Sequence, residues 1–445
     1  MSEKFDAIII GAGVIGAPIA YELSKMGYKT LTVDKLPDAG EGSTAGSCAI
    51  VRAHYSTEDG VAMAYEGFKY WLDWENYLDN VEDEKGLAKY MNTGSLLIKS
   101  KGHKWQNVQK HYDAVGVKYE EWDNDKIKEM VPVADLHEHW PVRRPEDPKF
   151  YDEPTAMLEG GIFCPEGGYV NDPALSAHNI MRAAEAKGAT FKFNAEVTDV
   201  RSENGKVCGV TLADGTQYDA PIVVNVGGPH SFKVNQMAEG VWEGCNIKTK
   251  SLRHEVMYCP SPDEYDYLND GYHMSDGDIG CYVRPETGNL FLIGSEDPDC
   301  DPQEWVDPDD FYAGRGGHGR DNVLTEEQWK AQCYRLAKRI PSLRVPNQPK
   351  GVVDLYDCSD DWIPIYDKSD LPGFYMAIGT SGNQYKNAPV VGRMMAELID
   401  QCEKGLDHDK EPFQFTYKYT GRKMDVGFFS RKREINYNSS FSVNG

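Results

Sequence analysis

The chain has 445 residues, of which 40% are hydrophobic, and its formal net charge is −24. Such an acidic chain argues against duplex nucleic acid or an anionic membrane surface as a partner, since both attract a basic protein face. Because no apolar run reaches the length of a membrane span, the first residues lack the features of a signal peptide, and the ten cysteines lack metal-binding spacing, we expect a cytoplasmic protein with reduced thiols and no metal.

The first forty residues predict a nucleotide-binding strand–turn–helix–strand unit. Residues 5–10 (FDAIII) are typical of a buried strand, and residues 11–16 (GAGVIG) form a G-x-G-x-x-G turn directly behind it. Apolar residues then recur at helical spacing, and KTLTVD reads as a second strand that ends in Asp34. An acid about 20 residues after the glycines is the pattern of a dinucleotide site.

Each part of this unit has a physical role. Gly11 permits the tight turn, Gly13 lets the backbone approach a pyrophosphate, and Gly16 lets the helix pack on the strand. The helix N-terminus offers N–H groups and a partial positive charge to the phosphates, and Asp34 can accept hydrogen bonds from a ribose. The cofactor-binding residues predicted here are Gly11, Gly13, Val14, Ile15, Gly16, Asp34 and Lys35.

The rest of the chain alternates between helical and strand patterns, without an internal repeat or a low-complexity segment. The predicted helices cover residues 66–78, 124–132, 171–189, 326–341 and 388–405. The predicted strands lie at residues 95–99, within 189–228 where NG and DG turns separate them, within 240–300, and at 374–379. Residues 313–320 (AGRGGHGR) read as a glycine- and arginine-rich turn.

Several ordered blocks of the sequence resemble the FAD-dependent amine and amino-acid oxidoreductases, a family that includes sarcosine oxidase, dimethylglycine dehydrogenase, glycine oxidase and D-amino-acid oxidase. The blocks are the N-terminal unit with Asp34, residues 41–56, residues 167–191, residues 223–231 and residues 373–392. Their joint occurrence makes FAD the expected dinucleotide, with free NAD less compatible.

The resemblance implies further FAD contacts. Val197 would offer backbone groups to the adenine, and the Gly227–Gly228 pair would let the chain pass closely over a flat cofactor. The glycine turn before the helix that opens near Pro389 could stabilise negative charge on the reduced flavin. The further cofactor-binding residues are Ser43, Thr44, Ser47, Cys48, Val197, Gly227, Gly228, Gly379, Ser381, Gly382, Asn383 and Lys386.

The resemblance to sarcosine oxidases also implies a substrate site. It places Arg52 and Lys386 at the two basic positions that bind the substrate carboxylate, and Tyr356 at the active-site tyrosine. A guanidinium fork with a second cation is well suited to fixing a carboxylate, although a single Arg or Lys is usually a solvated surface charge. His254 is a candidate base or orienting group, and Tyr282 a candidate substrate contact, beside the alternative of ordinary packing.

The sequence also departs from the family pattern. Asn383 replaces a common histidine, and Ala49 replaces the second arginine of sarcosine oxidases, which leaves the substrate and the oxygen reactivity open. Asp354 and Gly46 occupy the positions at which family members attach FAD to Cys or His. Because Cys48 and Cys358 are out of register with those positions, we predict non-covalent FAD.

Together these patterns predict an α/β fold with a doubly wound, Rossmann-like FAD-binding domain and a second, mostly antiparallel β-sheet substrate domain. The FAD-binding domain would comprise residues 1–90, 155–235 and 342–402. The substrate domain would comprise 91–154 and 236–341, and residues 403–445 would form a tail packed on the surface.

The function that this resemblance implies is oxidation of a secondary or tertiary amine, such as an N-methyl or N-alkyl amino acid. A hydride would pass to flavin N5, and water would hydrolyse the imine. The alternatives are a D-amino-acid or glycine oxidase, a dehydrogenase that uses an acceptor other than oxygen, and a non-catalytic FAD-binding assembly factor. The oligomeric state stays open.

Overall fold

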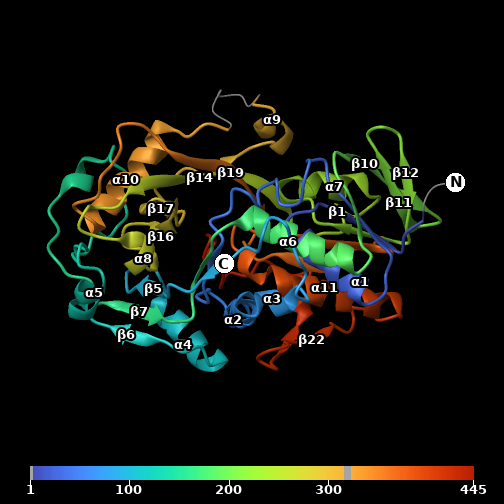
Figure 1. Cartoon of the computed structure of the whole chain (residues 1–445), viewed down its shortest axis with the longest axis horizontal. Coiled ribbons are helices and arrows are strands. Elements are labelled where there is room, and N and C mark those ends of the chain that lie inside the picture. The colour runs from blue at the N-terminus through green and yellow to red at the C-terminus, as the bar shows by residue number, and fades with distance from the viewer. Residues whose placement is uncertain (1–3, 315–321) are drawn as a thin grey trace.

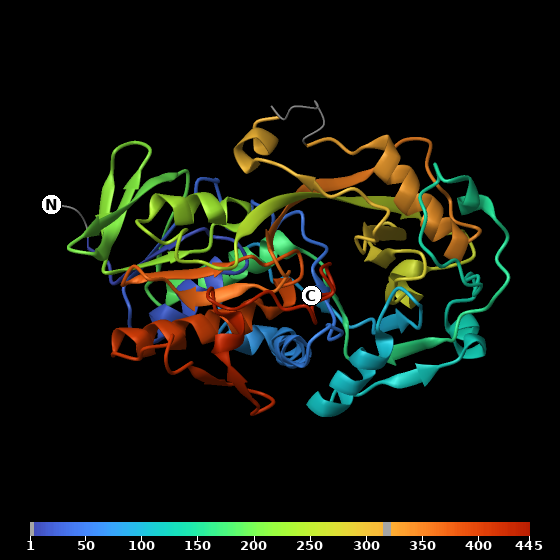
Figure 2. The same ribbon diagram turned by 180° about the vertical axis from the view of Figure 1, so that it is seen from behind.

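The computed structural model describes residues 4–314 and 322–445, and the chain folds into two parts that lie side by side in Figures 1 and 2. Most of the glycine-rich turn predicted at 313–320 lies outside the described residues. Within them, no helix combines the length and the apolar character that crossing a bilayer requires.

The first part is built on a six-stranded sheet whose strand order is β20-β21-β13-β1-β2-β9. All neighbours in it pair in parallel except β20 with β21. The strands are β1 (Ala7–Ile10), β2 (Thr30–Val33), β9 (Thr190–Lys192), β13 (Ile222–Asn225), β20 (Ile365–Lys368) and β21 (Phe374–Ile378).

Alternation along β1 explains why this sheet is covered on both faces. Ala7 and Ile9 belong to one buried cluster, and Ile8 and Ile10 belong to another, because successive side chains of a strand point to opposite faces. Helices α1 (Gly16–Lys25), α6 (Pro173–Ala186) and α11 (Ala388–Glu403) pack together against the first face (Figure 1).

The opposite face of this sheet carries a three-stranded antiparallel sheet, together with helix α7 (Ser231–Met237). That sheet contains β10 (Val197–Glu203), β11 (Lys206–Leu212) and β12 (Gln217–Asp219). The predicted NG and DG turns join its strands. Gly205 and Gly215, the glycines of these turns, both take the left-handed backbone conformation that favours glycine.

The second part is a nine-stranded, mostly antiparallel sheet. Its order is β18-β14-β17-β16-β15-β5-β7-β6, β19 pairs with β14, and only β5 and β15 pair in parallel. The strands are β5 (Ser95–Ile98), β6 (Glu120–Trp122), β7 (Gly161–Cys164), β14 (Thr249–Pro260), β15 (His273–Asp276), β16 (Cys281–Glu286), β17 (Leu290–Ser295), β18 (Glu304–Trp305) and β19 (Gly351–Ser359).

Helices and short elements complete the described chain. The helices are α2 (Glu58–Leu72), α3 (Trp74–Tyr77), α4 (Trp105–Val115), α5 (Asn124–Met130), α8 (Tyr267–Asp270), α9 (Pro308–Tyr312) and α10 (Glu326–Arg339), with 3-10 turns η1 (Pro148–Tyr151), η2 (Gly228–His230), η3 (Tyr385–Asn387) and η4 (Val426–Phe429). The small strands are β3 (Ile50–Val51), β4 (Tyr90–Met91), β8 (Gly168–Val170), β22 (Gln414–Thr416) and β23 (Lys423–Asp425).

Side-chain caps fix several helix starts where the sequence predicts them. The Asp172 carboxylate accepts a hydrogen bond from the Leu175 N–H at 2.9 Å, with Pro173 at the first helical position of α6. Asp123 caps α5 in the same way through the Lys126 N–H at 2.8 Å. The predicted helix at 66–78 is instead two helices, α2 and α3, which meet at Asp73.

The long paired strands β14 and β19 run from the second part to the first (Figures 1 and 2). Toward the end of β19, Cys358 forms an isolated β-bridge with Thr380, two residues after β21 ends. Sheet membership differs from the predicted domain boundaries here: β7 and β19 lie in ranges assigned to the FAD-binding domain, yet both pair with strands of the large sheet. The division into domains otherwise stays a prediction.

Residues 403–445 are not confined to the surface, which differs from the predicted surface tail. Arg431 is fully buried, and its guanidinium forms ion pairs with Asp367, Asp370 and Asp409. Apolar tail residues, among them Phe415 and Phe429, join the core beside α11. The sequence did not predict this burial, because apolar residues in the tail do not recur at a helical or strand spacing. A buried ion pair between Arg431 and Asp367 helps to hold the tail in place.

Candidate active site

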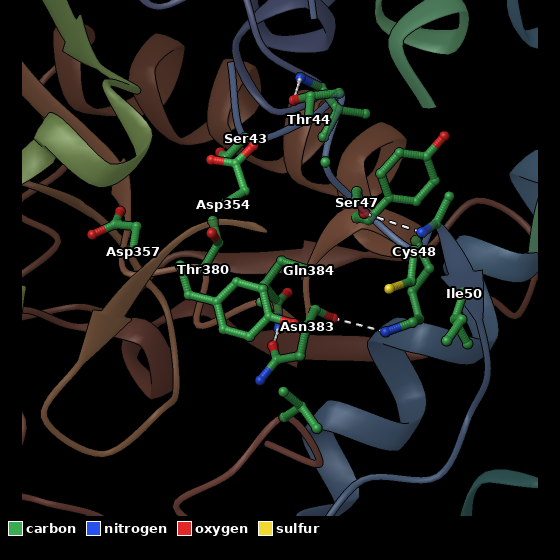
Figure 3. Close-up of a pocket in the computed structure, with 18 of the residues that line it drawn as sticks. Ser43, Thr44, Ser47, Cys48, Ile50, Asp354, Asp357, Thr380, Asn383 and Gln384 are labelled. Carbon is green, nitrogen blue, oxygen red and sulfur yellow. Dashed lines mark hydrogen bonds between the residues drawn. The ribbon is translucent and has the colours of Figure 1, made fainter. Parts of the chain in front are cut away.

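A single cavity joins the glycine turn of the first part to the edge of the large sheet. Its walls come from the 43–50 loop, β14, β19 and the turn that precedes α11. Figure 3 shows Cys48 and Ile50 on one side of this pocket and Asp357 on the other, with Asn383 and Gln384 between them. The predicted residues that line it are Gly13, Val14, Ile15, Gly16, Ser43, Thr44, Ser47, Cys48, Arg52, Gly228, His254, Tyr282, Tyr356, Gly382, Asn383 and Lys386.

The glycine turn is packed so tightly that two of its positions exclude a side chain. Gly11 has a φ of +115°, and a Cβ atom there would lie 2.3 Å from the Val226 carbonyl oxygen. A Cβ at Gly16 would lie 2.0 Å from the Gly11 carbonyl oxygen. The N-cap of α1 is Ile15, whose apolar side chain cannot cap it, so the first turn of the helix meets the cavity through its backbone.

Asp34 braces the same turn. Its carboxylate accepts hydrogen bonds from the backbone N–H groups of Ala12 at 2.7 Å and Leu36 at 2.9 Å. Burial raises the pKa of the Asp34 carboxyl above its usual value, although these two hydrogen bonds act in the opposite direction. Asp34, predicted to contact the ribose, therefore also has a structural role, because its carboxylate ties the end of β2 to the glycine turn.

The 43–50 loop closes one side of the cavity. Thr44 Oγ1 accepts a hydrogen bond from the Val14 N–H at 3.1 Å, and Ser47 Oγ accepts one from the Ala49 N–H at 3.1 Å. A Cβ at Gly46 would lie 2.5 Å from Asp354 Oδ2, so the two positions that correspond to covalent attachment in the family face each other. Neither side chain can form the Cys or His link, which supports the prediction of non-covalent FAD.

On the opposite side, Asp357 holds the turn that precedes α11. Its carboxylate accepts hydrogen bonds from the Gly379 N–H at 2.7 Å and from the Ser231 hydroxyl at 2.8 Å. Burial raises the pKa of Asp357 to about 7, and these two hydrogen bonds lower it less than burial raises it. The carboxyl group thus fixes the backbone of Gly379, and the Asp357 main-chain carbonyl accepts a hydrogen bond from the Ser381 N–H at 2.7 Å. Gly379 and Ser381 stand behind the cavity wall and do not line it.

The predicted basic pair comes together at the cavity. Arg52 follows β3 and Lys386 lies in η3, and both charged groups lie within 5.0 Å of the Tyr55 ring centroid. Lys386 Nζ donates to the Tyr55 hydroxyl and to the Asn383 carbonyl, each at 2.8 Å. Burial, together with the nearby Arg52 charge, lowers the pKa of Lys386 well below its usual value.

Arg52 is already occupied by main-chain carbonyls. Its Nη1 donates to the carbonyl of His54, and its Nη2 donates to the carbonyl of Val443 at 2.6 Å. Val443 and Asn444 line the cavity, so residues from the end of the described chain reach the candidate substrate site. Sequence reasoning found no role for these residues, because nothing in FSVNG indicates a ligand or a catalytic group.

Aromatic side chains form the wall beside β14 and β19. The rings of His254 and Tyr356 stack with centroids 4.4 Å apart, and His254 Nε2 lies 3.3 Å from Asp297 Oδ1. The Tyr282 hydroxyl and Cys48 Sγ form a hydrogen bond of 3.3 Å. Burial raises the pKa of Tyr356 and Tyr282 well above the usual value, so both phenols stay neutral and act as hydrogen-bonding groups.

A polar patch on β15 was not predicted. His273 and Ser275 line the cavity; His273 Nδ1 pairs with Ser95 Oγ at 2.8 Å, and Ser275 Oγ pairs with His54 Nε2 at 2.9 Å. Burial and nearby positive charges lower the pKa of both histidines well below the usual value, which keeps them neutral. The alternation of HMSD along a strand was the available signal, since His273 and Ser275 share one face.

Other predicted residues lie away from the cavity wall. Lys35 pairs with His230 Nε2 at 2.9 Å, and Val197 is buried in the cluster between the two sheets of the first part. Nearby, Arg284 forms an ion pair with Glu286 at 3.0 Å and donates to the Cys48 carbonyl. The predicted residues that do not line the cavity are Gly11, Asp34, Lys35, Val197, Gly227, Gly379 and Ser381.

The family described as FAD dependent oxidoreductase (DAO) matches residues 6–398. The chain belongs to this family. The sarcosine oxidase subunit beta of Rhodobacter capsulatus is 24% identical and covers 92% of this chain and 89% of its own. The glycine oxidase of Geobacillus kaustophilus is 23% identical, over 94% of this chain and 98% of the glycine oxidase. Among solved structures, L-proline dehydrogenase from P. horikoshii matches with a TM-score of 0.73 at 20% identity. The match covers 97% of this chain and 98% of the dehydrogenase chain.

Membership in the DAO family confirms the predicted fold class and the prediction of an FAD-dependent oxidoreductase of the sarcosine and glycine oxidase type. The residues present fit FAD. The glycine turn and the uncapped start of α1 meet one end of the cavity, and the basic pair meets the other. At Gly228 a Cβ would meet only one described atom within 4 Å, Ser43 Oγ at 3.7 Å, so a flat cofactor can approach the backbone there.

Proposed function

We propose that this DAO-family enzyme oxidises a secondary or tertiary amine, with an N-methyl or N-alkyl amino acid as the substrate class. The observation that carries this proposal is the convergence of Arg52, Lys386 and Tyr356 on the cavity that begins at the glycine turn. These three residues come from separate segments of the sequence, and a guanidinium beside a second nitrogen base is an arrangement that recognises carboxylates. When bound, FAD would supply the acceptor for the hydride.

The carboxylate would lie between Arg52 and Lys386. In the described chain both side chains donate to neutral oxygen atoms instead of carboxylates, so the cavity has a positive region without an internal counter-charge. An anion bound there would favour the protonated form of Lys386, since an opposite charge raises the pKa of an amine. Carboxylate binding should therefore be accompanied by proton uptake.

The aromatic wall would receive the amine and its substituents. Tyr282, Val256, Tyr356 and Leu252 are in one apolar cluster, and the first three line the cavity. An apolar wall disfavours an ammonium group and favours the neutral amine, the form that can give up a hydride from the neighbouring carbon. His254, stacked on Tyr356, would hold this wall in place and is a candidate acceptor for the amine proton.

Substitutions at the basic pair test the carboxylate site. We expect Arg52→Ala and Lys386→Ala to raise KM for an amino-acid substrate much more than they lower kcat, if the clamp binds ground state and transition state alike. Lys338→Ala is the matched control, because Lys338 lies outside the cavity wall and donates to the Phe150 carbonyl. If both cavity variants keep the kinetics of the unmodified enzyme, the assignment of these residues is wrong.

The electron acceptor and the flavin linkage call for two direct measurements. Turnover in air with release of hydrogen peroxide would identify an oxidase, and turnover only with an added dye or quinone would identify a dehydrogenase. Acid precipitation should release the flavin into the supernatant, because Gly46 and Asp354 offer no group that forms the family's covalent link. Flavin that remains with the precipitate would contradict non-covalent binding.

A further inference from the structure

Residues 439–445, which we call the strap, reach into the candidate substrate site. The Val443 carbonyl accepts the hydrogen bond from Arg52 Nη2 at 2.6 Å, at the position that the substrate carboxylate would need. The Gly445 carbonyl accepts a hydrogen bond from the Ser56 hydroxyl, and Asn444 Nδ2 lies 3.3 Å from His103 Nε2. The strap therefore makes polar contacts with Arg52, Ser56 and His103.

The Val443 side chain adds an apolar contact. It is 5% exposed and belongs to the cluster that contains Tyr282, Val256 and Trp362. Tyr282 and Val256 are among the side chains that would receive the amine and its substituents. One strap residue thus places a carbonyl oxygen on the guanidinium and an apolar group on the aromatic wall, an arrangement that resembles the carboxylate and the substituent of an amino acid.

The strap can leave the cavity without disturbing its anchor. Just before it, Arg433 forms an ion pair with the buried Asp361 at 2.7 Å and donates to the Pro364 and Ile363 carbonyls. Arg431 is likewise fixed, by an ion pair with the buried Asp367 at 2.9 Å. Tyr437 lies between the anchor and the strap and is 78% exposed, so the connection runs over the surface.

We propose that the strap is a built-in competitive ligand of the substrate site, which the substrate carboxylate must displace from Arg52. This rests on the proposed function, since it takes the carboxylate site to be at Arg52. Because binding requires the strap-open form, the apparent dissociation constant is the intrinsic one divided by the fraction of open molecules. A strap closed in about nine molecules of ten weakens binding about tenfold.

The test compares the FAD-loaded full chain with a variant that ends at Asn438 and keeps both arginine anchors. The probe is acetate, a carboxylate that cannot be oxidised as an amine, and its binding is followed through the flavin absorbance. We expect the shortened variant to bind acetate about tenfold more tightly. Tyr437→Ala, a substitution at an exposed side chain next to the strap, should bind acetate as the full chain does.

Two further measurements separate the possible outcomes. A peptide of residues 441–445 should compete with acetate on the shortened variant, and acetate should speed backbone hydrogen exchange within residues 439–445 of the full chain. Equal acetate affinity of the two forms, weaker binding by the shortened variant, or no acetate binding at all would each overturn the proposal. Failure of the amine-oxidation proposal alone has a different signature: acetate competes with the strap, yet no amine reduces the flavin.

Discussion

The two ends of the cavity are built in different ways. At the nucleotide end, the site is built mainly from the backbone of one short stretch, residues 7–34, with the Asp34 carboxylate and the Thr44 hydroxyl bracing it. Contacts as close as 2.0 Å exclude a side chain at Gly11 and Gly16. At the substrate end, side chains from β14, β15, β16, β19, η3 and the strap meet across long sequence separations. A site made of local backbone cannot change shape without disturbing the fold. A site made of distant side chains can be altered by substitution at single positions, and its substrate can change as a result.

The largest expected effect is at the nucleotide end. Gly11→Ala would place a Cβ 2.3 Å from the Val226 carbonyl, and we expect it to destabilise the fold by about 3 kcal/mol and to abolish FAD retention. Gly27→Ala is the matched control: φ there is +93°, but a Cβ would have no described atom within 4 Å, so only the backbone cost of about 1 kcal/mol remains. Urea denaturation and flavin content measure both; equal losses would show that the close packing at Gly11 is unimportant.

The next effect concerns Asp357, which joins the two ends by holding the Gly379 turn. Its pKa of about 7 in the folded protein exceeds the value of about 4 in an unfolded chain, so the folded form binds the proton more tightly. Its contribution to stability is thus fully present below about pH 4 and is lost as the pH rises to about 7. Between pH 5.5 and 8 this lowers the free energy of unfolding by about 2 kcal/mol.

Asp357→Asn removes this titration and keeps an acceptor for the Gly379 N–H. The pH dependence of the variant should therefore be shallower by that amount, measured by urea denaturation at pH 5.5 and 8. A variant with the same pH dependence as the unmodified protein would mean that Asp357 is ionised throughout this range.

A smaller effect is expected at Lys386, whose pKa burial and Arg52 lower. If carboxylate binding protonates it, acetate affinity falls up to about tenfold per pH unit wherever the free protein holds the neutral amine. Lys386→Met should remove this slope. Lys338→Met should keep it, because Lys338 lies outside the cavity although burial lowers its pKa as well. Titration of acetate across pH 6 to 9 decides: a slope that survives in Lys386→Met assigns the proton to another group.

The smallest effect is expected at Tyr356. Tyr356→Phe keeps the ring stacked on His254 and removes only a hydroxyl, so we expect a change in KM of about threefold and an unchanged kcat, the size of one neutral hydrogen bond. Steady-state kinetics with the best substrate measure it. A loss in kcat of about a hundredfold or more would instead place the phenol in the proton-transfer step.

The same contrast explains what could be predicted from the sequence. The β1–α1–β2 unit was predictable because each of its determinants, from Gly11 to Asp34, lies within one local pattern. Arg52, Lys386 and Tyr356 were found through the resemblance to a family and not through spacing, since no local rule brings them together. His273 and Ser275 were missed because a polar pair on a buried strand reads as ordinary packing until the cavity is known.

The strap was missed for a different physical reason. Its contact with Arg52 uses a backbone carbonyl, a group that every residue carries, so no side chain in SSFSVNG could indicate it. The buried state of Arg431 was equally hidden, because it depends on three aspartates, two of them about 60 residues away in the chain. Contacts of this kind follow from topology and cannot be read from a local pattern.

Anaerobic mixing of the FAD-loaded protein with a panel of N-methyl, N-alkyl, unsubstituted and D-amino acids tests the central claim most directly. The flavin absorbance near 450 nm should decrease with N-alkyl amino acids, and their parent amines without the carboxylate should react only at far higher concentration, since Arg52 would have no anion to bind. Reduction of the flavin by D-amino acids or glycine alone would contradict the substrate class, and a bound flavin that none of these compounds reduces would contradict amine oxidation at this cavity.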